Sequence, residues 1–76
     1  MPALEFIVEA GETALVMDTA RAAAGDALDR ITVAPIDGTP RFKVIIAVRA
    51  PAVPAVMRAV MDALEGKENR ANASQV

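Results

Sequence analysis

Residues 30–49 read RITVAPIDGTPRFKVIIAVR, and this stretch decides the fold. Two runs of β-branched and apolar residues, 30–34 and 41–49, stand on either side of the pair Asp37-Gly38. An Asp-Gly pair between two such runs is a strong signal for a β-hairpin. Pro35 has no N–H to donate to a neighbouring strand, so the first run is predicted to lie at a sheet edge or to end at this residue. The stretch therefore predicts two adjacent antiparallel strands.

Another strand and a helix are predicted before the hairpin. Residues 4–9 read LEFIVE. Alternate residues of a strand face opposite sides, so one side of this strand is wholly apolar and the other carries two carboxylates. Gly11 ends the strand, and from residue 12 to about residue 24 the apolar side chains recur with the 3.6-residue period of a helix. Gly25 is predicted to end that helix.

A second helix is predicted after the hairpin. Pro51 and Pro54 end the long strand and suit the first turn of a helix. Apolar residues then recur at helical spacing through residues 53–64. This apolar stripe includes Met57 and Met61, which are predicted to fill the core.

The chain is long enough for one domain only. Gly66 is predicted to cap the second helix at its C-terminus. Residues 67–76 are polar and have no period, so they are predicted to form a disordered tail behind a domain of residues 1–66.

These elements follow one another in the order β-α-β-β-α, which predicts an α+β fold. A β-α-β crossover is right-handed, and the hairpin places the third strand beside the second. With the third strand in the middle, the antiparallel sheet has the order 1-3-2 and both helices lie on one face. This is a ferredoxin-like sheet without its fourth strand. Glu5 and Glu9 would then share the open face with Lys43 and Arg49, and opposite charges on neighbouring strands attract.

Composition limits how so small a domain can be stabilised. A chain of 76 residues buries a modest fraction of its surface, and such folds commonly add disulfides, a metal or oligomerisation. The chain contains neither Cys nor His, so it has no disulfide and lacks the usual ligands of zinc, copper and iron–sulfur centres. No metal or cofactor is therefore expected, and oligomerisation is the stabilising device that remains.

The open face and the free edge of the first strand both favour self-association. An uncovered edge exposes unpaired backbone groups, and the open face carries apolar side chains among its charges. A homo-oligomer, most simply a dimer, is predicted to form edge to edge or face to face. The alternative is a monomer whose edge is protected by its two glutamates and by the tail. The predicted interface comprises Glu5, Ile7, Glu9, Lys43, Ile45 and Ala47.

Several classes of partner are disfavoured. A net charge of −2 does not fit a protein that neutralises phosphates, so no nucleic-acid partner is expected. Sheet-based RNA binding needs aromatic side chains on the open face, but Phe6 and Phe42 have the parity of core residues. The apolar run 44–48 is too short to span a bilayer, so no membrane partner is expected. The N-terminus has no basic region typical of a signal peptide, and a cytoplasmic location is expected.

No catalytic set is apparent. Without His or Cys, acid–base chemistry would fall to Asp, Glu or Lys. Asp26 and Asp29 lie in the predicted helix-to-strand connection, where they could form a paired carboxylate site. Capping and turn formation are the alternative role of such residues. The chain is therefore expected not to be an enzyme.

Residues 31–37, ITVAPID, resemble the segment after the first helix in the ACT domain of acetohydroxyacid synthase regulatory subunits. Gly11 and Gly25 are similar to glycines before the first helix and before the second strand of that family. The resemblance implies pairing between domains and a small-molecule ligand, an amino acid or a nucleotide. It implies a ligand site that comprises Gly11, Glu12, Asp26 and Ala27. Ala27 replaces a polar contact residue of the family, the first glycine is displaced by about one position, and the fourth strand has no counterpart.

Two other families share parts of the pattern. Residues 41–65 resemble the second half of nitrogen-regulatory PII-type sensors, without their long loop. Residues 10–12 and the alanine-rich helix resemble the small effector proteins of multicomponent monooxygenases. The expected function is a non-enzymatic regulatory module that self-associates and senses a small metabolite or modulates a larger enzyme. The alternatives are a structural assembly subunit and an effector component of a multicomponent enzyme.

Overall fold

The computed structural model describes the backbone of residues 2–73 and the side chains of residues 2–66. All the predicted elements are present in the predicted order. They are β1 (Ala3–Glu9), α1 (Thr13–Ala24), β2 (Leu28–Pro35), β3 (Arg41–Val48) and α2 (Val53–Ala73). Short 3₁₀ turns at Ala10–Glu12, Gly25–Ala27 and Ala50–Ala52 connect strands and helices.

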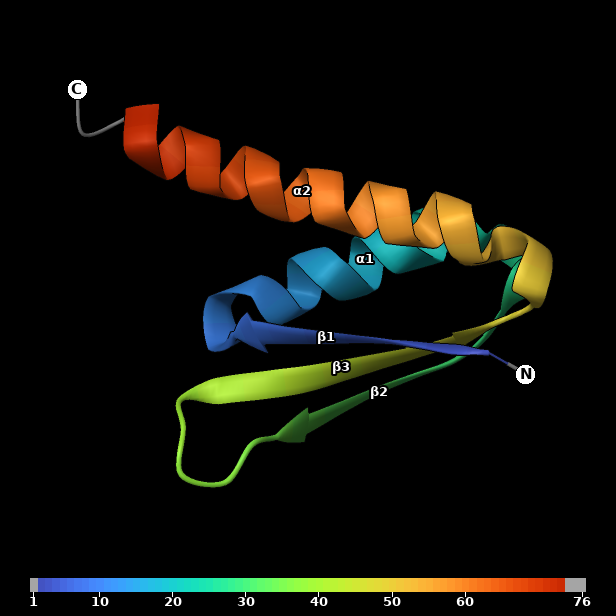
Figure 1. The fold of residues 1–76 in the computed structure, drawn as a ribbon, viewed down its shortest axis with the longest axis horizontal. Coiled ribbons are helices and arrows are strands. Elements are labelled where there is room, and N and C mark those ends of the chain that lie inside the picture. Colours follow the sequence, from blue (N-terminus) through green and yellow to red (C-terminus); the bar gives the residue numbers. More distant parts are fainter. Residues whose placement is uncertain (1, 74–76) are drawn as a thin grey trace.

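The three strands form one open antiparallel sheet in the order β1-β3-β2. In the middle of the sheet, Val44 of β3 lies between Phe6 of β1 and Val33 of β2. Both helices cover the same face of the sheet, and α2 passes in front of α1 (Figure 1). The predicted sheet order and α+β architecture are confirmed.

The second strand is longer than predicted. It covers Leu28–Pro35 rather than residues 30–34, and its pairing with β3 shifts register between Leu28 and Arg30. Asp29 is therefore an exposed strand residue, not part of the helix-to-strand connection that the sequence predicted. The register shift accommodates Asp29 as an extra residue, as a β-bulge does. Pairing with β3 can therefore extend past it to Leu28, and the strand begins earlier.

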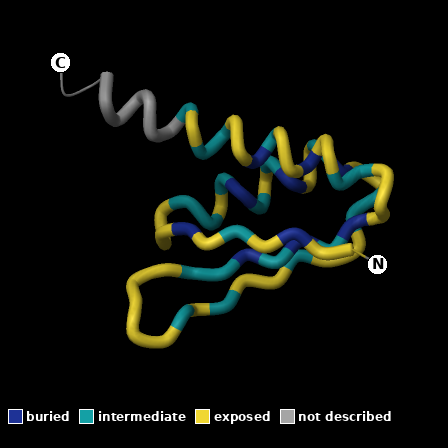
Figure 2. Tube along the Cα trace, viewed as in Figure 1, coloured by how far each residue is buried: buried dark blue, intermediate teal, exposed yellow. Residues whose placement is uncertain are grey.

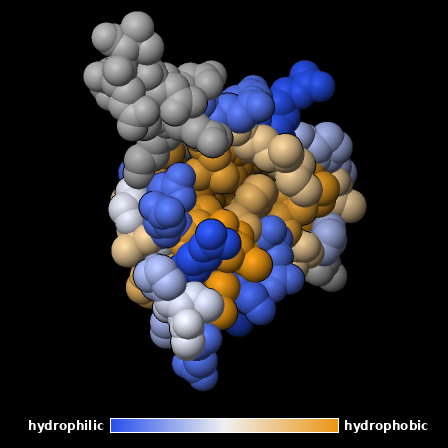
Figure 3. Space-filling model, turned by 60° about the vertical axis from the view of Figure 1, so that its left-hand side comes forward, coloured by the Kyte–Doolittle hydropathy of each residue, from blue (hydrophilic) through white to orange (hydrophobic). Residues whose placement is uncertain are grey.

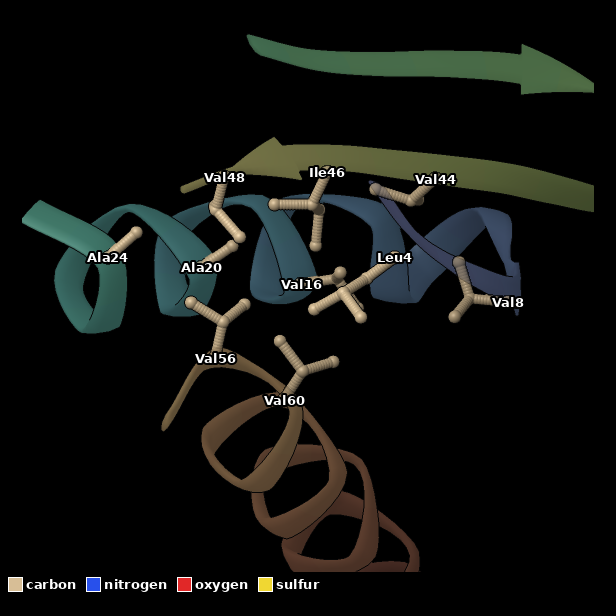
Figure 4. Close-up of a cluster of buried hydrophobic side chains, with 10 residues drawn as sticks. All are labelled: Leu4, Val8, Val16, Ala20, Ala24, Val44, Ile46, Val48, Val56 and Val60. Carbon is tan, nitrogen blue, oxygen red and sulfur yellow. The ribbon is translucent and has the colours of Figure 1, made fainter. Parts of the chain in front are cut away.

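The core lies between the sheet and the two helices. Alternate residues of β1 and β3 point into it, as the strand period requires, and meet residues of α1 and α2 that are three or four positions apart (Figures 2 and 4). Val16, Val44 and Ile46 have no exposed surface. The buried side chains are Leu4, Val8, Val16, Ala20, Ala24, Val44, Ile46, Val48, Val56 and Val60.

Two side chains predicted to fill the core are exposed. Met57 has 37% of its surface accessible and Met61 has 54%, although Val56 and Val60 beside them are fully buried. Successive residues of a helix are rotated by about 100°, so the two methionines lie on one flank of the buried valines. The prediction was wrong because the apolar stripe on α2 is wider than the surface that α1 and the three strands offer it.

The second helix does not end at Gly66. It continues to Ala73, and Gly66 is not among the glycines with positive φ, whereas Gly25 and Gly38 are. The predicted cap was wrong because a glycine lowers helix propensity without requiring a left-handed backbone, and Lys67, Glu68 and Arg70 are good helix formers. The predicted tail therefore begins as helix. Residues 74–76 and the side chains of residues 67–73 lie outside the described part of the chain.

Within residues 2–73, neither helix combines the length and the apolar character that a membrane span requires.

Candidate functional site

The six residues of the predicted interface lie together on the open face of the sheet. The register of β1 and β3 sets Glu5 opposite Ile45 and Ile7 opposite Lys43. The Nζ atom of Lys43 lies 2.9 Å from Oε1 of Glu5, which confirms Lys43 as an ion-pair partner. Ile7 is 60% exposed and lies in the middle of this polar surface. The open face thus holds an exposed apolar centre with charged side chains of both signs around it.

One predicted member of this face lies elsewhere. Arg41, not Arg49, is opposite Glu9, because β3 is antiparallel to β1 and ends at Val48. The guanidinium of Arg49 donates a hydrogen bond to the backbone oxygen of Asp26. Its backbone N–H donates to the backbone oxygen of Ala27 over 3.0 Å. Arg49 therefore joins the end of β3 to the connection that follows α1.

The four residues of the predicted ligand site do not come together within one chain. Gly11 and Glu12 precede α1, whereas Asp26 and Ala27 follow it. The twelve residues of α1 make a helix about 18 Å long, at about 1.5 Å per residue. One small molecule bound to this chain therefore could not contact both pairs.

The structure gives Glu12 a capping role. Its carboxylate oxygen accepts a hydrogen bond of 3.0 Å from the backbone N–H of Glu9. In return, the Glu9 side chain faces the backbone N–H of Glu12, which completes a capping box. Such a box satisfies backbone donors at a helix start that would otherwise lack partners. Thr13 adds a hydrogen bond from its hydroxyl to the oxygen of Ala10. The carboxylates of Glu9 and Glu12 thus stabilise the turn from which α1 starts.

A hollow of about 540 Å³ lies along the exposed side of α2. It is open to solvent and shares no residue with the predicted ligand site. No pattern in the sequence indicates this hollow, because its walls lie outside the apolar stripe of the helix. Its lining residues are Pro54, Ala55, Arg58, Ala59 and Asp62.

The two edges of the sheet differ in how they are protected. On β2, Pro35 lacks an N–H donor and the bulge leaves Asp29 outside the regular pairing. Proline and bulges are devices by which proteins discourage strand addition. The seven residues of β1 contain no proline and pair with β3 in an unbroken register. Of the two edges, β1 is the one suited to accept another strand.

One flank of α2 is apolar and exposed. Helix α1 contacts β3 and β2, α2 packs mainly on α1, and Val60 of α2 points toward Leu4 of β1 (Figure 4). On either side of the buried Val56, half-buried Ala59 and exposed Met57 define opposite flanks of α2. The methionine flank, with Met57 and Met61, is therefore an apolar part of α2 that neither α1 nor the sheet buries.

A space-filling view toward one end of the molecule shows apolar side chains at the centre, with hydrophilic side chains around them (Figure 3). Sequence reasoning missed the exposed methionine flank because it placed the whole apolar stripe of α2 in the core. The signal that could have found it is the pair Met57 and Met61, which extends the stripe beyond the positions of Val56 and Val60.

Among the residues that the structure describes, no three acidic side chains converge in a way that could hold a metal ion. The open face and the β1 edge are therefore the surfaces on which a functional proposal can rest. Neither a protein-family model, nor a curated protein, nor a solved structure matches the chain.

Proposed function

We propose that this chain is a non-enzymatic regulatory module that self-associates through the open face of its sheet and modulates a larger partner protein. The observation that carries the proposal is the exposed Ile7, which lies among charges of both signs on a face that no helix covers. A small domain gains stability when a second copy covers such a face.

The pattern of charge on the open face favours contact between two copies. Glu5 and Glu9 lie along β1, while Lys43 and Arg41 lie along β3. When two such faces meet about a two-fold axis, the acidic row of one copy can lie over the basic row of the other. Opposed rows of this kind set the orientation of a complex, and burial of the apolar centre supplies affinity.

The likeness of the fold to that of ACT domains supports a regulatory rather than a catalytic role. The element order and the sheet order fit a ferredoxin-like fold without its fourth strand, and ACT domains are regulatory modules of that kind. The geometry does not favour the metabolite-sensing form of the proposal, because Gly11 and Asp26 lie at opposite ends of α1. Modulation of a partner protein is the form that we retain.

The mass of the protein in solution tests the proposal. Sedimentation of the unchanged chain is expected to show a dimer at micromolar concentration. Ile7→Lys is expected to shift the protein to a monomer, because it removes the apolar centre whose burial supplies affinity.

Ala22→Lys is the matched control, because Ala22 is exposed on α1, away from the sheet. This variant should sediment as the unchanged protein does, and circular dichroism should show that both variants are folded. A protein that remains monomeric at all concentrations, or a dimer that tolerates Ile7→Lys, would contradict the proposal.

A further inference from the structure

We infer that the β1 edge and the methionine flank of α2 form a slot for one extended strand of a partner protein, with alternating basic and apolar side chains. This surface shares Glu5 and Glu9 with the open face through which we propose self-association, but it lies along the outer edge of β1. The slot has three parts, namely a backbone edge, an apolar wall and an acidic border.

The backbone edge supplies affinity that does not depend on sequence. One side of β1 is paired with β3 from Ala3 to Glu9, and no pairing of its other side occurs within the described residues. A strand added there would form a regular ladder of backbone hydrogen bonds, as in other cases of strand addition. The neighbouring strands of this sheet are antiparallel, so the added strand is expected to be antiparallel to β1.

The apolar wall lies on the helix side of the slot. Phe6 is only half-buried although it points toward the core, and Met57 and Met61 of α2 are exposed apolar side chains. Apolar side chains of an added strand would continue the core layer under these residues. Methionine suits this role because its flexible, polarisable side chain adapts to different partners.

The acidic border lies on the open side of the slot and determines the chemistry of the partner. Glu5 and Glu9 are the charged side chains of β1, whereas the basic side chains Lys43 and Arg41 lie one strand further in. An added strand would be two strand spacings, roughly 10 Å, from those basic groups. At that distance salt largely screens their charge, while the carboxylates would be immediate neighbours. Lysine or arginine on the added strand therefore complements the edge.

The molecule itself contains a strand of this chemistry beside β1. On the inner side, β3 places Arg41 opposite Glu9 and brings Lys43 to 2.9 Å from Glu5. Its side chains on the opposite face, such as Val44 and Ile46, are apolar and buried. The outer side of β1 presents the same carboxylates to a second strand.

A second copy of β1 fits the slot less well. Directly opposed residues in an antiparallel pair share a face, so the even-numbered and odd-numbered residues of β1 must pair among themselves. Pairing Glu5 with Glu5 or Glu5 with Glu9 sets like charges opposite each other, which is destabilising. Pairing Phe6 with Phe6 avoids direct opposition, but each Glu5 then lies diagonal to both carboxylates of the other copy.

A peptide of the sequence Lys-Val-Ile-Val-Lys-Val-Thr, with a Trp-Gly extension at its N-terminus, tests the inference. In antiparallel register its lysines face Glu9 and Glu5. The chain has no Trp or Tyr, so tryptophan fluorescence reports on the peptide alone. We expect saturable binding that is roughly tenfold or more tighter than that of the same peptide with both lysines replaced by Glu.

Variants of the protein separate the parts of the slot. Glu5→Gln combined with Glu9→Gln should remove the preference between the two peptides. Met61→Lys should weaken binding of the lysine peptide roughly tenfold, by loss of the apolar wall. Ala55→Lys, at an exposed position on another side of α2, should leave it unchanged. The mass of each variant, measured in parallel, separates loss of peptide binding from loss of self-association.

Equal affinity for the two peptides, or an absence of saturable binding to the lysine peptide, overturns the inference. A dimer that Met61→Lys disrupts and Ile7→Lys spares would also overturn it, because a second copy would then occupy the edge. Failure of the peptide to bind while the unchanged protein is a dimer leaves the proposed self-association intact.

Discussion

At the scale of single residues, the position of a side chain along a strand decides what it does. Ile46 and Ile7 are the same amino acid on neighbouring strands, yet Ile46 is fully buried and Ile7 is 60% exposed. They differ because alternate residues of a strand face opposite sides, and the helices cover only one side of this sheet. The same alternation brought Glu5 and Lys43 together on the open face, as the sequence predicted.

This contrast predicts different effects of the same substitution. Ile46→Val should lower the free energy of unfolding by about 0.5–1.5 kcal/mol, because it leaves a cavity in a close-packed core. Ile7→Val should change it by less than about 0.5 kcal/mol, as is usual for exposed positions. Urea denaturation of both variants, below the concentration at which the protein self-associates, measures the difference. Equal losses would mean that Ile7 is packed in the isolated chain.

Among the secondary-structure elements, Gly25 and Gly66 differ in backbone conformation, although the sequence predicted the same role for both. Gly25 and Gly66 were both predicted to end helices. Gly25 follows α1 with φ of 53° and ψ of −128°, a conformation that side chains with a Cβ rarely adopt. Gly66 lies inside α2, and a Cβ added there would meet no atom within 4 Å.

The two glycines should therefore respond in opposite directions to alanine. Gly25→Ala should destabilise the fold by about 1–3 kcal/mol, because the native backbone at this residue is strained for alanine. Gly66→Ala should stabilise the protein by up to about 1 kcal/mol, since alanine is the better helix former and has room. Thermal unfolding followed by circular dichroism gives both signs. A loss of stability in Gly66→Ala would show that the helix depends on this glycine.

At the level of the whole domain, one face of the sheet and the outer edges of β1 and β2 are uncovered within the described residues. Self-association stabilises the folded state by mass action, since a dimer binds folded chains and not unfolded ones. The unfolding temperature should therefore rise with protein concentration. In Ile7→Lys, which is expected to be monomeric, it should be independent of concentration. Calorimetry over a hundredfold range of concentration makes the comparison, and a constant unfolding temperature in the unchanged chain would count against association.

Local patterns in the sequence were enough to predict the number, order and type of the elements. The Asp37-Gly38 turn, the alternation in residues 4–9 and 41–48, and the helical spacing of Val56 and Val60 are local signals, because they arise from the geometry of each element alone. With the right-handed crossover, they also determined the sheet order. The interface residues on the open face followed from the same alternation.

The exposure of a side chain and its contacts with distant residues could not be predicted in this way, because they depend on how the elements pack together. Met57 and Met61 have the spacing of core residues, but their exposure depends on the absence of a strand outside β1 among the described residues. Arg49 and Asp26 are 23 positions apart, and their hydrogen bond depends on how the end of β3 packs against the end of α1. Burial and long-range contacts are properties of two or more elements together, so the period within one element cannot specify them.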